Sequence, residues 1–436
     1  MLKTATCLCV LRVLFALRDS EVAHLIPDQP TFIDTPNVPA SSAIVTASEE
    51  VPQVQDLEVD LSKIDLAELE ELPDCTNGEL PLLAKFYKVT RHVQIKESCN
   101  VTADGTTLLV NTTLKFVDTA RLDGKLSVKA MNALQGPCLA FKSDAFVAAS
   151  AELHFANCHN IDKVFGGGGE VDGGAMNVRG SLSVIGSLTI RDCRTKHGEG
   201  GGIAVQQDFF HSNGSISIIN SSAGKDGGSI YVEQNFTHSG GSISIEGSSG
   251  YNGGAIAVKQ HFFHNGSISI INSSAGDDGG SIYVEQNFTH SGGNISVEGS
   301  SAKESGGAIY VRYHFTQSGG SLAVTNSSAQ WFGGAIWVRK SFNHSGGSIS
   351  VEGSSAKNGD GGAISVWEDF TQSGGSLAVT NSWAQGPGGS IYVLASFNHS
   401  GGSISVEGSS AKNGDGGAIY VLASFNHSGG SISVEG

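Results

Sequence analysis

Short apolar runs with a period of two residues dominate the C-terminal two thirds of the chain. In residues 227–252 these runs are Ile230 with Val232 and Ile243 with Ile245, and small or polar residues alternate with them. β-Branched side chains at alternate positions are typical of strands, and no apolar helical period occurs here. Gly-Gly, Ser-Gly-Gly and Gly-Ser-Ser sequences separate the runs and predict turns. The segment therefore predicts two clear strands and a weaker third strand around Phe236.

The same segment recurs at a nearly constant period. A Gly-Gly step followed by a small residue and an Ile-x-Val or Met-x-Val run occurs ten times, at spacings of 26 to 28 residues. The steps begin at Gly173, Gly200, Gly227, Gly253, Gly279, Gly306, Gly333, Gly361, Gly388 and Gly416. A fixed period in this range is the signature of stacked coils. We therefore predict an all-β fold, a right-handed parallel β-helix of about ten coils of 26–28 residues.

Equivalent positions in successive repeats carry the same side chain. An isoleucine column runs from Ile203 to Ile419, a valine column from Val205 to Val421, and a phenylalanine column from Phe209 to Phe425. In a parallel β-helix such columns stack inside the coil at intervals of about 4.8 Å. The residue before each Ser-Ser pair alternates between Asn and Gly, which both tolerate a left-handed backbone and so predict one shared corner.

The composition divides the chain into four parts. Residues 1–17 contain a lysine followed by an apolar run, which is typical of a secretory signal. Residues 18–80 carry fifteen acidic and two basic side chains and most of the prolines, which predicts a disordered segment. We interpret residues 81–165 as an N-terminal cap with degenerate coils and residues 166–436 as the β-helix repeats, which look truncated at their C-terminal end.

The charge and hydropathy of the chain argue against nucleic acid as a partner and against a transmembrane span. The net charge of −16 is concentrated in the acidic segment, and the repeats are close to neutral, so no basic face for nucleic acid is expected. No later stretch reaches about 18 continuous apolar residues, so we expect no transmembrane span. The chain stops at Gly436 partway through a repeat. The strand edges of that coil are therefore a candidate surface for end-to-end self-association.

Cysteine is confined to the first 193 residues. Cys158 and Cys193 occupy the position that Ser221 holds in a later repeat, so we expect them at the same corner of neighbouring coils. A Cys158–Cys193 disulfide is therefore a candidate, and the five cysteines that follow the signal leave one thiol unpaired.

Thirteen Asn-x-Ser/Thr sequons are consistent with a secreted glycoprotein, although repeats rich in Asn, Ser and Thr also create sequons by composition alone. The candidate N-glycosylation sites are Asn100, Asn111, Asn235, Asn287, Asn343, Asn398 and Asn426.

A histidine column follows the phenylalanine column by two residues. Its members His238, His264 and His290 are weak candidate ligands for Zn²⁺ or Cu²⁺. No carboxylate or thiol accompanies the column, and Gln317 and Gln372 replace histidine in two repeats. We therefore favour hydrogen bonding along a ladder of turns. The sequence gives no reason to expect a metal or a cofactor.

An aromatic column lies between the isoleucine and valine columns. Its members are Tyr231, Tyr283, Tyr310, Trp337, Tyr392 and Tyr420. The period of two residues points them away from the core, and exposed aromatic rings stack on sugars or pack against proteins. This column is the best candidate binding site, and shielding of a sheet face is the alternative. The column that follows it alternates in charge through Glu233, Lys259, Glu285 and Arg312, which predicts weak attraction between coils.

The repeats also resemble a known family. GGAIYV at 306–311 and 416–421 and GGAIWV at 333–338 follow Asn-Ser-Ser-Ala or Gly-Ser-Ser-Ala turns. These motifs resemble the repeats of polymorphic outer membrane proteins, in the right-handed parallel β-helix (pectate-lyase-like) group. The resemblance covers about residues 160–436. It implies an extracellular passenger used in adhesion or surface display.

These observations favour a non-enzymatic, secreted or cell-surface β-solenoid that serves as a structural or adhesive binding module for a glycan or an extracellular protein. The sequence shows no nucleophile motif, phosphate loop or Cys-x-x-Cys pair. The rival hypothesis is a polysaccharide lyase or glycoside hydrolase on the same scaffold. An enzyme of that kind needs carboxylates and basic side chains that converge at one cleft, whereas a binding module needs uniform stripes.

Overall fold

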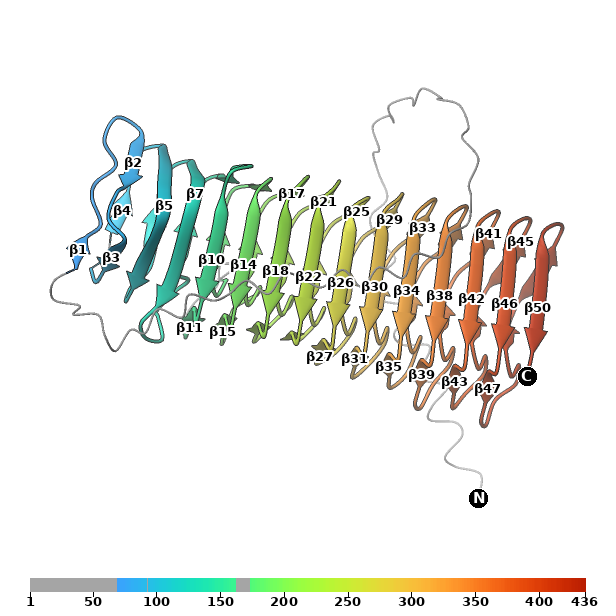
Figure 1. Cartoon of the computed structure of the whole chain (residues 1–436). Helices are drawn as coiled ribbons and strands as arrows, with labels where there is room; N and C mark the ends of the chain where they lie inside the picture. The colour runs from blue at the N-terminus through green and yellow to red at the C-terminus, as the bar shows by residue number, and fades with distance from the viewer. Residues whose placement is uncertain (1–68, 92, 162–172) are drawn as a thin grey trace, which may run out of the picture. The chain divides into compact units, whose positions relative to one another are not determined.

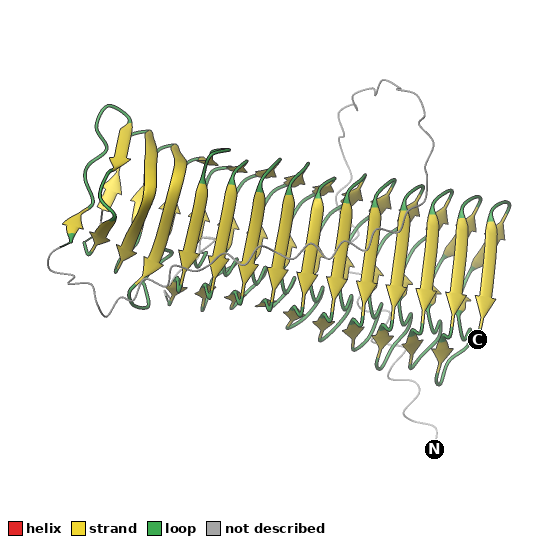
Figure 2. Ribbon diagram, in the orientation of Figure 1, coloured by secondary structure: helices red, strands yellow, loops and turns green. Residues whose placement is uncertain are grey.

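The computed structural model describes residues 69–436 except residue 92 and residues 162–172. In this part of the chain the regular structure consists of strands, without a helix (Figure 2). The strands form a parallel β-solenoid, with successive coils side by side along one axis (Figure 1). The parallel all-β solenoid predicted from the repeats is confirmed. The expected signal at 1–17 and residues 18–68 of the expected acidic segment lie outside the described residues.

One coil contains four strands. In the coil that begins at Gly227 they are β20 (Ile230–Val232), β21 (Phe236–His238), β22 (Ser242–Glu246) and β23 (Ser249–Gly250). The weaker strand expected around Phe236 is therefore present. The two-residue strand β23 follows the corner and was not expected. Each strand is short because a Gly-rich or Ser-rich turn ends it.

Like strands of successive coils pair in parallel and form three sheets. The Ile-x-Val sheet has 13 strands, namely β4 (Val93–Ile95), β6 (Leu114–Phe116), β8 (Leu139–Phe141), β12 (Met176–Val178), β16 (Ile203–Val205), β20, β24 (Ile256–Val258), β28 (Ile282–Val284), β32 (Ile309–Val311), β36 (Ile336–Val338), β40 (Ile364–Val366), β44 (Ile391–Val393) and β48 (Ile419–Val421). Its register keeps each column intact, because Ile230 pairs with Ile256 and Val232 with Val258. The ten strands from β12 onward match the ten counted repeats.

The long sheet has 27 strands and covers two sides of each coil. It combines Phe-x-His strands such as β17 (Phe209–His211), β21 and β25 (Phe262–His264) with Ser-Ile-Ser strands such as β18 (Ser215–Ile219), β22 and β26 (Ser267–Ile271). In the early coils β5 (Cys99–Val110) and β7 (Ala120–Ala130) each run along both sides without a break. The corner sheet has ten two-residue strands, from β11 (His159–Asn160) to β47 (Ser410–Ala411).

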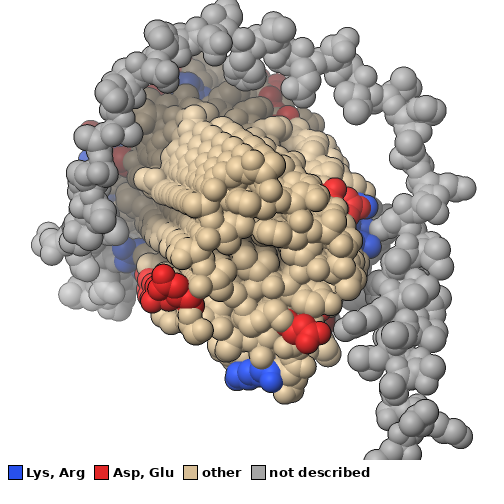
Figure 3. Space-filling view, turned by 90° about the vertical axis from the view of Figure 1, so that its right-hand side faces the viewer, with Lys and Arg blue, Asp and Glu red and all other residues tan. Residues whose placement is uncertain are grey.

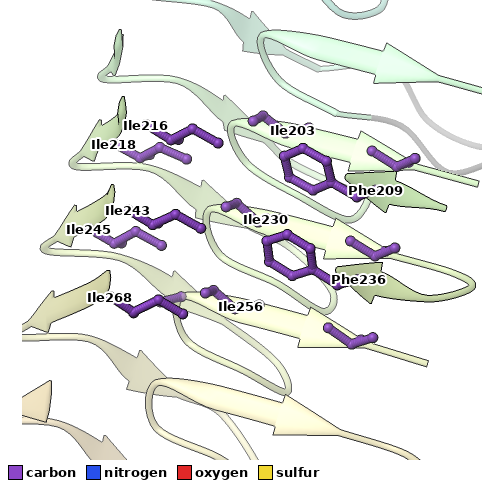
Figure 4. Packing of buried hydrophobic residues seen from close by; sticks show 14 of the residues in the cluster. Ile203, Phe209, Ile216, Ile218, Ile230, Phe236, Ile243, Ile245, Ile256 and Ile268 are labelled. Atoms are coloured by element: carbon purple, nitrogen blue, oxygen red, sulfur yellow. The ribbon is translucent and has the colours of Figure 1, made fainter. Parts of the chain in front are cut away.

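The core lies inside the coils and consists of the predicted columns (Figure 4). The phenylalanine rings stack face to face, with 4.7 Å between the ring centroids of Phe209 and Phe236 and 4.8 Å between those of Phe236 and Phe262. Each fully buried phenylalanine contributes roughly 1.5–3 kcal/mol through burial. One coil exposes both flanks of its columns, so this stabilisation depends on neighbouring coils.

Glycine and asparagine are required where the backbone is left-handed. The predicted corner is confirmed, because Asn220 has φ 52° and Gly247 has φ 64° at equivalent positions of successive coils. The first glycine of the repeated step is also left-handed, with φ 67° at Gly227. The second glycine, Gly228, meets the backbone of the next coil so closely that a Cβ atom would collide with the carbonyl oxygen of Gly254. Both glycines of the step are thus fixed by geometry.

The solenoid begins earlier than the sequence predicted. Residues 69–80, assigned to the disordered segment, contain β1 (Glu70–Glu71) and the first residues of β2 (Glu79–Leu82). A disulfide joins Cys75 to Cys99, and Leu80 is buried in the core. The prediction was wrong here because composition averaged over a long window hides a short apolar stretch at its end. The residues described between 81 and 161 form further coils.

Candidate binding face

The predicted aromatic column points away from the main core, but it is not exposed. Tyr231 is only 2% exposed and Trp337 only 6% exposed, and Tyr283 and Tyr310 are buried as well. These four side chains form a second apolar cluster outside the Ile-x-Val sheet. Tyr392 and Tyr420 are half-buried. The expectation of an exposed aromatic stripe on this sheet was therefore wrong.

Neighbouring side chains cover the aromatic column. Phe332 and Trp367 pack against it, the Tyr231 hydroxyl donates a hydrogen bond to Glu233, and the Lys259 ammonium lies 5.5 Å from the ring centroid of Tyr283. Long charged side chains bury their stems on apolar surface and keep their heads in water. The alternating charged column directly after the strand was the signal in the sequence that could have predicted this cover.

The charged column forms an ion-pair row along the axis, which confirms the predicted attraction between coils. Lys259 Nζ lies 3.0 Å from Asp226 and 3.2 Å from Glu285, and Arg312 lies 2.7 Å from Glu285. Burial lowers the pKa of Lys259, but the Asp226 and Glu285 carboxylates outweigh it and raise that pKa above its ordinary value. Lys259 therefore stays protonated and is unsuited to act as a base.

One carboxyl group beside this row has a strongly shifted pKa. Burial, together with the nearby Asp277, raises the pKa of Asp278 to about 8, although the hydrogen bond that the Ser305 N–H donates to the carboxylate opposes the shift. Burial also raises the pKa of Glu199. Asp278 thus holds its proton at neutral pH, whereas Asp226, two coils earlier in the same ladder, is paired with Lys259.

The histidine column lies inside the solenoid. The rings of His211, His238, His264, His290, His344 and His399 are fully buried, and successive rings are 4.9–5.0 Å apart between centroids from His211 to His290. In the first five, neither ring nitrogen makes a hydrogen bond of standard geometry with a described residue, although backbone groups of the following Gly-Gly turn favour protonation of His238, His290 and His344. These histidines therefore form the predicted ladder of hydrogen bonds only weakly. It holds for the replacements, since Gln317 donates to the Ser348 carbonyl and Gln372 to the Ser403 carbonyl.

Burial keeps these histidines uncharged at neutral pH. It lowers the pKa of His211 and of His238 to about 4 and that of His264 to about 2, although backbone groups of the following turn favour protonation of His238. The rings of His238 and His264, and those of His264 and His290, are tilted by 60° to each other with their centroids 5.0 Å apart. No group of three or more His, Cys, Asp or Glu in residues 69–436, gaps aside, is placed to hold a metal.

The cysteines pair differently from the prediction. Cys158 bonds to Cys138, not to Cys193, which is buried and unpaired among the described residues. The two positions do share a corner of adjacent coils, as expected, because the Cys158 N–H lies 3.4 Å from the Cys193 sulfur. Burial raises the pKa of Cys193 to about 12, so its thiol stays protonated. Sequence spacing alone does not decide between two partners that are both near Cys158.

The candidate glycosylation sites fall into two groups. Asn100, Asn111, Asn343 and Asn426 are exposed, whereas Asn235, Asn287 and Asn398 are half-buried. Asn235 donates to Asp208 and accepts from the His261 N–H, so its amide is part of a turn ladder. Glycosylation at these positions stays a prediction.

The outward face of the long sheet is exposed, polar and repetitive. Its Ser-Ile-Ser strands present two rows of small side chains, such as Ser215 and Ser217 on β18 and Ser242 and Ser244 on β22. Viewed along the axis, charged side chains gather at a few edges of the coil, and most of the visible surface is uncharged (Figure 3). Hydroxyl groups at every coil can donate and accept hydrogen bonds along the axis.

Three exposed phenylalanines interrupt this polar face. Phe146 on β9 (Ala145–Val147), Phe210 on β17 and Phe263 on β25 are 39%, 42% and 43% exposed. They occupy the middle position of the Phe-x-His strand, between two inward side chains. We did not predict them as site residues. For Phe210 and Phe263 the signal was the sequence Phe-Phe-His in place of Phe-Thr-His, and for Phe146 it was Ala-Phe-Val; each puts an aromatic ring on the polar side of a strand.

Comparison with known proteins identified no relative of this chain. No family model, no curated protein and no solved structure matches this chain. Among the residues that the structure describes, none belongs to a helix with the length and apolar character needed to cross a membrane.

Proposed function

We propose that this chain is a non-enzymatic binding module, secreted or displayed at a cell surface, whose partner is a glycan or an extracellular protein. The observation that carries the proposal is the outward face of the long sheet, where rows of uncharged hydroxyl and amide side chains repeat from coil to coil. A surface of this kind makes many equivalent weak contacts with an extended partner. The resemblance of the GGAI motifs to repeats of polymorphic outer membrane proteins supports surface display.

The charges of the molecule also favour binding over catalysis. Lys259 and Arg312 neutralise Asp226 and Glu285 in a continuous row, so these groups stabilise the stack and leave no unpaired base there. Ion pairs between adjacent coils contribute roughly 0.2–1 kcal/mol each at partly exposed positions. End-to-end association through the last coil stays a prediction.

The experiment combines a glycan array and a panel of extracellular proteins with a lyase and hydrolase screen on the full chain. The proposal expects saturable binding to a member of either panel without turnover. Release of reducing ends or of unsaturated products from any polysaccharide would overturn it.

One observation favours the enzymatic alternative. Asp278 is protonated at neutral pH and has the carboxyl groups of Asp277 and Glu304 close enough to raise its pKa, and a protonated carboxyl group is what the general acid of a glycoside hydrolase needs. If the chain hydrolyses a glycan, Asp278→Asn should abolish turnover while the fold is retained. If the chain only binds, the same variant should leave ligand affinity unchanged.

A further inference from the structure

The exposed phenylalanines recur on alternate coils of one row. Phe146 pairs with Ser183, Ser183 with Phe210, Phe210 with Thr237, and Thr237 with Phe263. Successive phenylalanines are therefore two coils apart, or about 9.6 Å at the spacing of paired strands. Phe146 belongs to a degenerate coil, so the alternation does not arise only from duplication of the regular repeat.

The fold does not require an aromatic ring at this position. Ser183, Thr237 and Thr289 occupy the same place in neighbouring coils and keep the same strand pairing. An exposed ring adds apolar surface in contact with water, whereas the small hydroxyl residues do not. The three rings are thus best explained by contact with something outside the coil.

From Phe146 to Phe263 the row that holds the rings and the next outward row are uncharged, whereas Arg121, paired with Asp123, adjoins Phe146 one coil earlier. The next outward row along the strand contains Ile185, Ser212, Ser239 and Asn265, which are exposed beside the phenylalanines. Between Phe146 and Phe263 neither row contains Lys, Arg, Asp or Glu. Between Phe146 and Phe263 an acidic polysaccharide or a nucleic acid would meet no counter-charge in these two rows, whereas a neutral chain of sugars would find hydroxyl and amide groups beside the rings.

We infer that the row Phe146–Phe210–Phe263 is a stacking platform for an uncharged β-1,4-linked polysaccharide lying along the solenoid axis. In such an extended chain, every second sugar presents the same face, and the disaccharide repeat is close to the two-coil spacing. Sugar C–H groups would pack on the rings, while Ser212, Ser239 and Asn265 would bind ring hydroxyls. This inference rests on the proposed binding function and names its ligand class.

The platform predicts a length dependence. Phe146 and Phe263 are four coils apart, a span of about 19 Å that roughly five sugar units would cover. We would titrate the full chain by calorimetry with the disaccharide and the hexasaccharide of cellulose, of chitin and of β-1,4-mannan. In one of these three pairs the hexasaccharide should bind about ten-fold more tightly than the disaccharide, or more.

Variants taken from neighbouring coils test the rings themselves. Phe210→Ser and Phe263→Thr copy the residues of adjacent coils, so the fold should be kept, and the double variant should lose about ten-fold or more in hexasaccharide affinity. Phe263→Tyr keeps a stacking ring and should bind as the unaltered chain does. Tyr313→Gln removes an exposed ring outside the row and serves as the matched control.

The outcomes separate this inference from the proposed function. Absence of binding to all the neutral hexasaccharides, or equal binding by the double variant and the unaltered chain, would overturn the platform. If a protein ligand, an acidic glycan or another carbohydrate bound instead, the proposed function would stand and the platform would fail. Circular dichroism of each variant shows whether lost affinity reflects lost structure.

Discussion

The buried histidine column should make the solenoid sensitive to acid. The pKa of His211 and of His238 is lowered to about 4 and that of His264 to about 2 by burial, against 6.5 in the unfolded chain. Below pH 6.5 these histidines are protonated in the unfolded chain but stay neutral in the folded chain until the pH approaches their lowered pKa values. Stability from these groups is therefore complete above pH 6.5 and is lost as the pH falls toward the folded pKa values.

The magnitude follows from the shifts. At pH 5 each of the three histidines lowers the free energy of unfolding by about 2 kcal/mol relative to neutral pH, or about 6 kcal/mol together. Replacing two of them should remove about 4 kcal/mol of this loss. His238→Gln/His264→Gln is the chosen variant, because Gln317 and Gln372 occupy the same column in later coils and hydrogen-bond to the next coil.

The assay is urea unfolding at pH 7 and pH 5, followed by circular dichroism. Between pH 7 and pH 5 the urea concentration at the unfolding midpoint should fall far more for the unaltered chain than for the double variant. His314→Gln, at an exposed histidine outside the column, should behave like the unaltered chain. Asp278 and Glu199 titrate in the opposite sense, but they are common to all three proteins and cancel in the comparison. Equal pH sensitivity of the unaltered chain and the double variant would refute the reasoning.

Three further changes have defined outcomes. Asp278→Asn should raise the free energy of unfolding at pH 7 by up to about 4 kcal/mol in thermal or urea unfolding, because a carboxyl group whose pKa is raised in the folded state destabilises the fold as the pH rises past its unfolded pKa. Asn252 holds the same ladder position one coil earlier, so the fold accepts an asparagine there. An unchanged unfolding midpoint would count against a raised pKa. Cys193→Ser should leave the Cys138–Cys158 disulfide intact in peptide mapping, since Ser221 fills the same column, and a scrambled Cys158 pairing would contradict this. Gly254→Ala should lower the melting temperature strongly, by an overpacking penalty of roughly 1–3 kcal/mol or more, because its Cβ would meet a carbonyl oxygen of the next coil; an unchanged melting temperature would contradict the close approach.

Several features of this protein are determined by its sequence alone. The period of the Gly-Gly step sets the coil, the alternation within Ile230–Val232 sets which side chains face inward, and Asn or Gly before Ser-Ser sets the corner. Each of these signals is local. Because the same signals repeat along the chain, the structure of one coil predicts the structure of the coils beside it. The start of the solenoid near Leu72 was hidden, because a few apolar residues there are outweighed by the acidic residues around them.

Only the tertiary structure decided which outward residues meet water. Tyr231 and Phe210 both point away from the core, but Glu233 and the residues after the strand fold over the first, and nothing among the described side chains buries the second. Likewise, Cys158 has two cysteines within reach, and the path of the chain brings Cys138 to it. A residue pattern specifies the direction of a side chain, whereas its exposure and its partner depend on segments distant in sequence that pack beside it.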